Sequence, residues 1–180
     1  MKSMIKSIVT LISVCLISAA LLGTVNFLTK DKIKAADDAA TIEALDKVME
    51  GTPNPTPLNL EGVEVDSTVV EVYKSDKGEV AVKMSTKGFK TGFIIMCGVS
   101  ADGKVVGSVC LDSNESYGYE YTYGENFIGK NAEEAEAVDT ISGATKTSTG
   151  YKKAVKVAIE TAKLVKDIPV IEMEEEGNEK

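Results

Sequence analysis

The sequence predicts an α+β protein with one N-terminal transmembrane helix, followed by an antiparallel β-sheet domain covered by helices. Three observations support this fold class. The first thirty residues contain a long stretch without charge, short β-rich runs separated by turn residues follow between residues 63 and 111, and an amphipathic run lies near the C-terminus. The chain has 180 residues, 43% hydrophobic and 27% charged, which is the composition of a protein that folds around a core.

Composition also limits the function. The formal net charge is −8, and every basic side chain is a lysine, because the chain has no arginine and no histidine. With an acidic balance and no arginine, a nucleic-acid partner is not expected. Without histidine, the commonest ligand of catalytic zinc and the commonest general base at neutral pH are missing. We therefore expect no metal site and no histidine-based catalysis in the chain, and any chemistry has to come from carboxylates, hydroxyls, thiols or a bound cofactor.

Residues 1–30 are the predicted membrane anchor. The segment 7–28 carries no charge, and at about 1.5 Å per residue it covers roughly the 30 Å hydrocarbon core of a bilayer. A cleaved signal peptide is the rival interpretation, but the apolar run is long for one and no A-x-A-like site follows it. A lipoprotein modified at Cys15 is less favoured, because the bulky Val14 precedes this cysteine. Lysines flank both ends, so the N-terminus is expected in the cytoplasm only because the long acidic remainder has no second span and can be translocated whole.

Residues 31–58 are predicted to form a juxtamembrane helix and a Pro-rich connector. Alanines and long apolar side chains recur at helical spacing in residues 31–50. The helix is ended by Gly51, Pro53, Pro55 and Pro57. The connector is therefore expected to be rigid and extended.

Residues 59–168 contain the predicted sheet domain. Its β-rich runs are separated by turn residues and span 63–75, 79–89, 91–100 and 104–112. The turns contain glycine, at Asp76-Lys77-Gly78, at residues 88–90 and at Asp102-Gly103. An antiparallel meander is the simplest arrangement of these runs. In the third and fourth runs both alternating faces are apolar, so these two strands are predicted to be central and covered on both sides.

A final helix is predicted to cover this sheet. Its apolar residues fall on one helical face, and they are Tyr151, Ala154, Val155, Ala158, Ile159, Ala162 and Val165. Residues 169–180 are largely acidic and are predicted to be a solvated tail.

Two cysteines lie on either side of the Asp102-Gly103 turn. If this turn is a two-residue hairpin loop, Cys97 pairs with Ser108, and Cys110 lies diagonal to Cys97 on the same face. The sequence leaves open whether the two thiols are buried and free or joined in a disulfide. Their spacing is not that of a C-x-x-C redox pair.

A cluster of hydroxyl residues precedes the final helix and comprises Thr140, Ser142, Thr145, Thr147, Ser148 and Thr149. Unpaired backbone N–H groups and the helix dipole at such an N-terminus favour a phosphate group. Gly143 and Ala144 allow the chain to approach a ligand closely. The alternative is that Thr147 or Ser148 only caps the helix and that Asp139 forms an Asx turn.

The segment "DTISGATKTS", residues 139–148, resembles the flavinylation motif D-x-x-S-G-A-T-x-[ST]-S of the FMN-binding domain family. This family includes the G subunit of the Rnf ion-translocating ferredoxin:NAD oxidoreductase and the C subunit of the sodium-pumping NADH:quinone reductase. The positions that match are Asp139, Ser142, Gly143, Ala144 and Thr145, with Thr147 and Ser148 following. The segments "FIIMCGVSADGKVVGSVCLDSNES" and "NFIGK" are similar to the family's hairpin and to its F-x-G-K. The order of predicted elements is the family's order over essentially the whole chain.

The chain departs from the family in the loop that follows the hairpin. Where the family has E-T-P-G-L-G, this chain has Glu115-Ser116-Tyr117-Gly118-Tyr119-Glu120. The glutamate, a hydroxyl residue and the first glycine are kept. The proline and the leucine are replaced by tyrosines, and the last glycine is replaced by Glu120.

The resemblance implies a covalent FMN, joined as a phosphoester to Thr145 by a separate flavin transferase that uses FAD and releases AMP. Asp139 is implied to shape the turn or to present it to the transferase. The implied cofactor-binding residues are Glu115, Ser116, Tyr119, Lys130, Ser142, Gly143, Ala144, Thr147 and Ser148. Further candidates for stacking on the flavin ring are Tyr117, Tyr121 and Tyr123. An exposed, salt-bridging role for Lys130 is the alternative.

The implied function is that of an electron-transfer subunit with covalent FMN in a membrane-bound, ion-translocating Rnf complex. The implied partners are membrane lipid, other membrane subunits and iron–sulfur subunits of that complex. The FMN domain is expected on the extracytoplasmic side, where a covalent tether keeps the flavin from diffusing away. Alternatives are a membrane-anchored FMN-binding sensor, a solitary extracytoplasmic electron carrier, and the homologous subunit of the quinone reductase. The coupling ion, sodium or proton, is left open.

Overall fold

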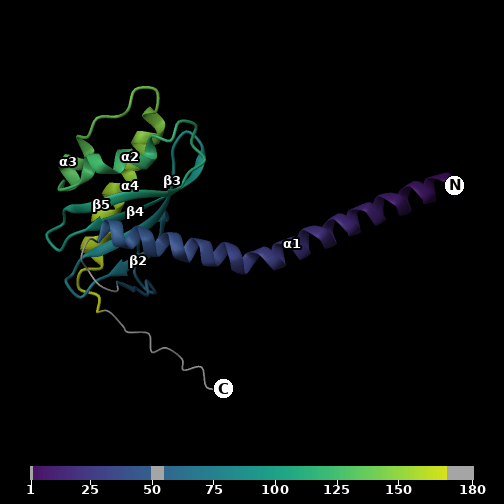
Figure 1. Ribbon diagram of the computed structural model, residues 1–180, viewed down its shortest axis with the longest axis horizontal. Coiled ribbons are helices and arrows are strands. Elements are labelled where there is room, and N and C mark those ends of the chain that lie inside the picture. The colour runs from purple at the N-terminus through teal and green to yellow at the C-terminus, as the bar shows by residue number, and fades with distance from the viewer. Residues whose placement is uncertain (1, 50–54, 170–180) are drawn as a thin grey trace, which may run out of the picture. The chain divides into compact units, whose positions relative to one another are not determined.

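The computed structural model describes residues 2–49 and 55–169 (Figure 1). The first half of the predicted connector, including Gly51 and Pro53, and nearly all of the predicted acidic tail lie outside these ranges. The chain divides between Ala40 and Thr41 into two compact units.

The N-terminal part of the chain is a single helix, α1, which runs from Lys2 to Val48. The two segments predicted to be helical, 7–28 and 31–50, are continuous in it as far as Val48, since neither proline nor glycine stands at residues 29 and 30, where they join. Within it, Ile8–Val48 contains a window of mean hydropathy 2.4, none of which is buried. By length and composition this helix can cross a membrane.

The second unit is built on a five-stranded antiparallel sheet in the order β1-β2-β3-β4-β5. The strands are β1 (Thr56–Pro57), β2 (Val69–Lys74), β3 (Val80–Lys87), β4 (Thr91–Val99) and β5 (Val105–Asp112). The predicted meander is confirmed, and Gly78 and Gly103 adopt positive φ in two of its turns. The short edge strand β1 was not predicted, since a proline in a two-residue strand gives no period-two pattern.

The prediction that the fourth β-rich run is a central strand is wrong, because β5 lies at an edge of the sheet. Its two faces are apolar because both are packed against other parts of the domain. Its outer edge is also partly covered. Val105 exchanges backbone hydrogen bonds with Gly129 (2.8 Å) and Lys130 (3.0 Å), and a Cβ at Gly124 would collide with the Ser108 carbonyl oxygen. Apolar residues on both faces of a strand therefore indicate that both faces are covered, but they do not show whether the strand is central or at an edge of the sheet.

Helix α4 (Thr145–Leu164) covers one face of the sheet, as predicted. All seven residues of the predicted helical face are buried, namely Tyr151, Ala154, Val155, Ala158, Ile159, Ala162 and Val165. The helix is in close contact with the turn between β3 and β4, since a Cβ at Gly150 would collide with the Lys87 carbonyl oxygen. This contact fixes the N-terminal half of α4 beside that turn.

The last turns of α1 cover the opposite face of the sheet. Ala44, Leu45, Val48 and Met49 form a buried cluster there with strand residues that include Met96. Gly98 is required for this approach, because a Cβ on it would collide with the carbonyl oxygen of Val48. The sheet is therefore buried on both sides.

Three short helices lead from β5 to α4, and they are α2 (Glu120–Tyr123), η1 (Gly124–Phe127) and α3 (Ala132–Glu136). Asn131 and Glu134 form a capping box that begins α3. On the sheet, Cys97 pairs with Ser108 as predicted, and both Cys97 and Cys110 are free thiols.

Candidate functional site

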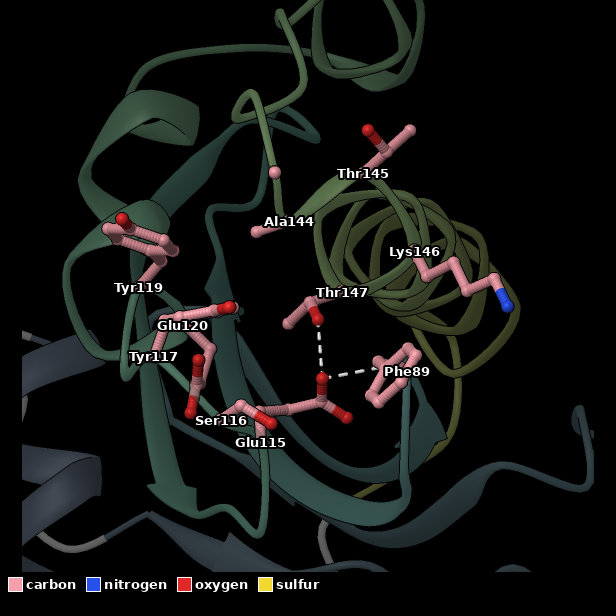
Figure 2. Close-up of a pocket in the computed structure, with 11 residues that line it drawn as sticks. Phe89, Glu115, Ser116, Tyr117, Tyr119, Glu120, Ala144, Thr145, Lys146 and Thr147 are labelled. Carbon is pink, nitrogen blue, oxygen red and sulfur yellow. Dashed lines mark hydrogen bonds between the residues drawn. The ribbon is translucent and has the colours of Figure 1, made fainter.

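A pocket of about 380 Å³ opens at the N-terminus of α4 (Figure 2). This volume is within the range of small-molecule sites, about 300–1,000 Å³. Three segments line it: the turn after β3, the loop from β5 into α2, and the loop that enters α4. The lining residues are Phe89, Glu115, Ser116, Tyr117, Tyr119, Glu120, Gly143, Ala144, Thr145, Lys146 and Thr147. The pocket thus joins the predicted hydroxyl cluster to the loop in which the chain departs from the family pattern that it resembles.

The hydroxyl cluster does not cap the helix in the way the alternative interpretation predicted. The N-cap residue is Ala144, which has no side-chain acceptor, so neither Thr147 nor Ser148 is the cap. The N–H groups of Thr145, Lys146 and Thr147 have no intrahelical acceptor, because the first helical bond is that of Ser148 to Ala144. The first turn also contains no acidic residue. The start of α4 therefore favours an anion supplied from outside the helix.

Ser148 holds the turn that precedes α4. Its buried hydroxyl accepts a hydrogen bond from the Ile141 N–H (3.1 Å) and donates one to the Ala144 carbonyl oxygen (3.0 Å). The Tyr123 hydroxyl fixes the chain just before this turn by donating to the Asp139 carbonyl oxygen (2.8 Å). Gly143 completes the turn with a φ of 83°. Hydrogen bonds and a positive φ therefore determine the approach of this loop to α4.

Glu115 connects the three segments around the pocket. Its carboxylate accepts hydrogen bonds from the Thr147 hydroxyl and from the backbone N–H groups of Phe89 (3.1 Å) and Lys90 (2.8 Å) (Figure 2). Gly88 leaves the space for this arrangement, because a Cβ there would lie 2.9 Å from both a Glu115 oxygen and the Thr147 Cα. Partial burial disfavours the charged form of Glu115, but the hydrogen bonds from Thr147, Lys90 and Phe89 outweigh it and lower the pKa of this carboxyl group.

Aromatic side chains form the rim of the pocket. Tyr117 and Tyr119 are 73% and 43% exposed and stack on each other, with their ring centroids 5.8 Å apart. The exposed Phe89 ring has the Lys146 Nζ 5.5 Å from its centroid. Tyr121 is exposed and does not line the pocket, whereas Tyr123 is buried against Phe127 and Tyr151.

The structure brings some of the predicted site residues to the pocket and leaves others away from it. Those that line it are Glu115, Ser116, Tyr119, Gly143, Ala144, Thr145 and Thr147. Ser148 lies beneath it, and Ser142 and Asp139 are exposed on the turn beside it. Lys130 is not brought to the pocket, because its backbone pairs with Val105 at the start of β5, whereas Glu115 follows the end of that strand.

Sequence reasoning did not select three of the lining residues, Phe89, Lys146 and Glu120. Of these three, Lys146 could have been selected from the sequence, because it directly follows Thr145. A lysine in the first turn of a helix that binds an anion is adjacent to the ligand. Glu120 was visible only as a departure from the family's loop. Phe89 has no sequence signal, because it reaches the pocket only through the packing of the β3–β4 turn against α4.

Comparison with protein families identifies the class of protein. Residues 88–160 match the FMN-binding domain. This range contains β4, β5, all the residues that line the pocket and most of α4. The chain therefore carries an FMN-binding domain.

A second match makes the assignment more specific. Residues 1–48 match the RnfG N-terminal region, which corresponds to the whole of α1. The chain is an RnfG-like protein. The comparison with curated proteins gave no match.

The residues of the pocket fit FMN. The free N–H groups at the start of α4 and the Lys146 ammonium suit its phosphate. The rings of Tyr117, Tyr119 and Phe89 suit a flat apolar ring system. The pocket therefore has Tyr117 and Tyr119 on one side and Lys146 with Phe89 on the other, so aromatic rings and a cation are both available to a molecule with a phosphate and a large ring.

Proposed function

We propose that this chain is the FMN-carrying electron-transfer subunit of a membrane-bound Rnf ferredoxin:NAD oxidoreductase complex, and that its FMN is attached to Thr145 as a phosphoester. The observation that carries the proposal is the position of Thr145. It is an exposed residue of the flavinylation-like motif, it is the first residue of α4, and it lies on the rim of the pocket.

The other hydroxyls at the start of α4 are poor attachment points. The Ser148 hydroxyl is buried and bonded to two backbone groups, and the Thr147 hydroxyl donates to Glu115. Thr145 lies on the outer side of the pocket, away from the Thr147–Glu115 hydrogen bond (Figure 2). A transferase can therefore reach the Thr145 hydroxyl without breaking a contact that holds the fold.

The residues around Thr145 would hold the attached phosphate. The N–H groups of the first turn and the Lys146 ammonium stabilise its negative charge. Ser142 and Gly143 shape the turn, Ser148 holds it closed, and Asp139 presents it to the transferase. FMN supplies one-electron and two-electron redox chemistry when it is bound, and the chain supplies its position and surroundings.

The helix α1 provides the membrane part of the proposal. It has the length and hydropathy of a membrane anchor and matches the RnfG N-terminal region, which favours the Rnf complex over the quinone reductase. We place the N-terminus in the cytoplasm and the FMN domain on the extracytoplasmic side, with membrane and iron–sulfur subunits of the complex as partners. A covalent tether has a physical purpose on that side, because a dissociated flavin would be lost by dilution.

Attachment is tested by expressing the chain with a flavin transferase and FAD, followed by denaturing electrophoresis and fluorescence imaging. The wild-type chain should give a fluorescent band, because a phosphoester survives unfolding. Thr145→Ala should abolish the band, whereas Thr145→Ser keeps the hydroxyl and should retain it. Thr147→Ala, Ser148→Ala and Asp139→Ala should weaken labelling without abolishing it. A band that persists in Thr145→Ala, or a wild-type chain that stays dark beside an active transferase, would contradict the proposal.

A further inference from the structure

Glu120 is a buried carboxylic acid that lines the pocket. The residue is only 3% exposed. Within residues 2–49 and 55–169, no group donates a hydrogen bond to its side chain or forms a salt bridge with it. No fully enclosed side-chain oxygen or nitrogen of the described residues lacks a partner, so the Glu120 carboxyl group keeps some contact with solvent, and the residue lines the pocket.

The other buried polar side chains near the site differ from Glu120, because each has a partner inside the protein. The Thr86 hydroxyl donates to the Gly150 carbonyl oxygen (3.3 Å), and the hydroxyls of Ser108 and Tyr151 lie 2.9 Å apart. A buried polar group without a partner costs free energy, and a buried carboxylate costs more than a neutral group. A ligand group that enters the pocket and donates a hydrogen bond would therefore stabilise the Glu120 carboxyl group, which has no donor of its own among the described residues.

We propose that Glu120 accepts a hydrogen bond from the uncharged part of the flavin, either from the imide N–H of the ring or from a hydroxyl of the ribityl chain. This inference rests on the proposed function. The phosphate is excluded as the partner, since a carboxylate and a phosphate repel each other.

The two sides of the pocket support this orientation. Figure 2 shows Thr145 and Lys146 on the α4 side, and Glu120 with Tyr117 and Tyr119 on the opposite side. The side that carries Lys146 receives the phosphate, and the side that carries Glu120 receives the groups that can donate a hydrogen bond. The loop pattern E-T-P-G-L-G of the related family has glycine at this position, so the pattern itself does not supply this carboxylate.

A binding role and a structural role for Glu120 predict opposite effects of its substitution on the stability of the flavin-free protein. Glu120→Gln keeps the shape of the side chain and removes its charge. Because the carboxylate lacks a partner in the flavin-free protein, this change should leave its stability unchanged or raise it. It should at the same time weaken flavin binding about tenfold, as expected for loss of a charge-assisted hydrogen bond.

The experiment uses the full chain in detergent with Thr145→Ala, so that binding is reversible. Riboflavin is the probe, because it lacks the phosphate, and binding is followed by flavin fluorescence. Glu125→Gln is the matched control, since Glu125 is exposed on η1 and does not line the pocket. We expect Glu120→Gln to raise the riboflavin Kd about tenfold relative to this control, with thermal unfolding of the flavin-free protein at an equal or higher temperature.

Two analogues identify the donor. Lumiflavin lacks the ribityl hydroxyls, and N3-methylriboflavin lacks the imide N–H. The effect of Glu120→Gln should disappear for the analogue that lacks the true donor. An equal effect on riboflavin and both analogues, or equal Kd values for the Glu120 and Glu125 variants, would overturn the inference. If neither riboflavin nor FMN binds the Thr145→Ala chain, the inference about Glu120 is overturned, whereas the proposed attachment at Thr145 is judged separately by the fluorescent band of the wild-type chain.

Discussion

Thr147→Val is the most direct test of the pocket's architecture. Valine keeps the size and β-branching of threonine but removes the hydroxyl that donates to Glu115. The carboxylate keeps its two backbone donors, Phe89 and Lys90. The loss should therefore lie at the lower end of the range for a hydrogen bond to a charged group, about 1.5 kcal/mol. For a domain of this size, that corresponds to a fall in Tm of about 4–6 °C.

The destabilisation caused by Thr147→Val should decrease as the pH is lowered. The hydrogen bonds lower the pKa of Glu115 from its ordinary value of 4.5 in the folded chain. Their contribution to stability is therefore present above pH 4.5 and is lost as the pH falls through the lower folded-state value. The difference in Tm between the wild type and Thr147→Val should be full at pH 7 and should shrink below pH 4.5.

Thermal unfolding followed by circular dichroism measures both effects. Thr149→Val is the control, because Thr149 lies on the same helix but is exposed, and its effect should stay within about 0.5 kcal/mol. Our explanation of the pocket is refuted if Thr147→Val destabilises no more than this control, or if the difference between wild type and variant is the same at pH 7 and pH 3.

Other predictions concern the ends and faces of the domain. Gly98→Ala places a methyl group against the Val48 carbonyl oxygen, so the free energy of unfolding in urea should fall by at least about 1–3 kcal/mol; an unchanged value would show that α1 does not pack there. A shortened chain that begins at Asp31 should be soluble and monomeric and should accept flavin, as measured by gel filtration and fluorescence, and aggregation would show that the anchor is part of the fold. A protease added to intact cells without their wall should remove the FMN domain, and full protection would reverse the proposed orientation. Iodoacetamide should label both sheet thiols slowly at pH 8, because burial raises the pKa of Cys97 to about 12, and partial burial with the nearby Glu120 and Asp112 raises that of Cys110 to about 12; rapid labelling of Cys97 would contradict its burial.

Much of the fold could be predicted from local patterns. The β-rich runs and the turn residues between them predicted the four longer strands and their meander, and the helical spacing of Tyr151 to Val165 predicted the buried face of α4. The edge position of β5 could not be predicted in this way. Residues 124–130 cover that edge, and their approach depends on backbone contacts that leave no periodic signal.

The site was predictable where the motif was contiguous in the sequence. Thr145 and Gly143 were placed correctly beside the helix N-terminus because the local sequence determines that turn. Phe89 was missed because only the packing of its turn brings it to the pocket. Lys130 was selected by resemblance to a family motif, and the motif does not show that Lys130 lies at the start of β5 while the pocket lies beyond its end. The burial of Glu120 without a partner is visible only in three dimensions.

The central claim is that Thr145 carries FMN, and peptide mapping of the chain from native membranes tests it most directly. Trypsin cleaves after lysine and places Thr145 in the peptide of residues 131–146, while Thr147 and Ser148 fall in the peptide of residues 147–152. We predict that the first peptide is heavier by one FMN less one water and that fragmentation locates the added mass on Thr145. An unmodified first peptide, or the added mass on the second, would contradict the claim.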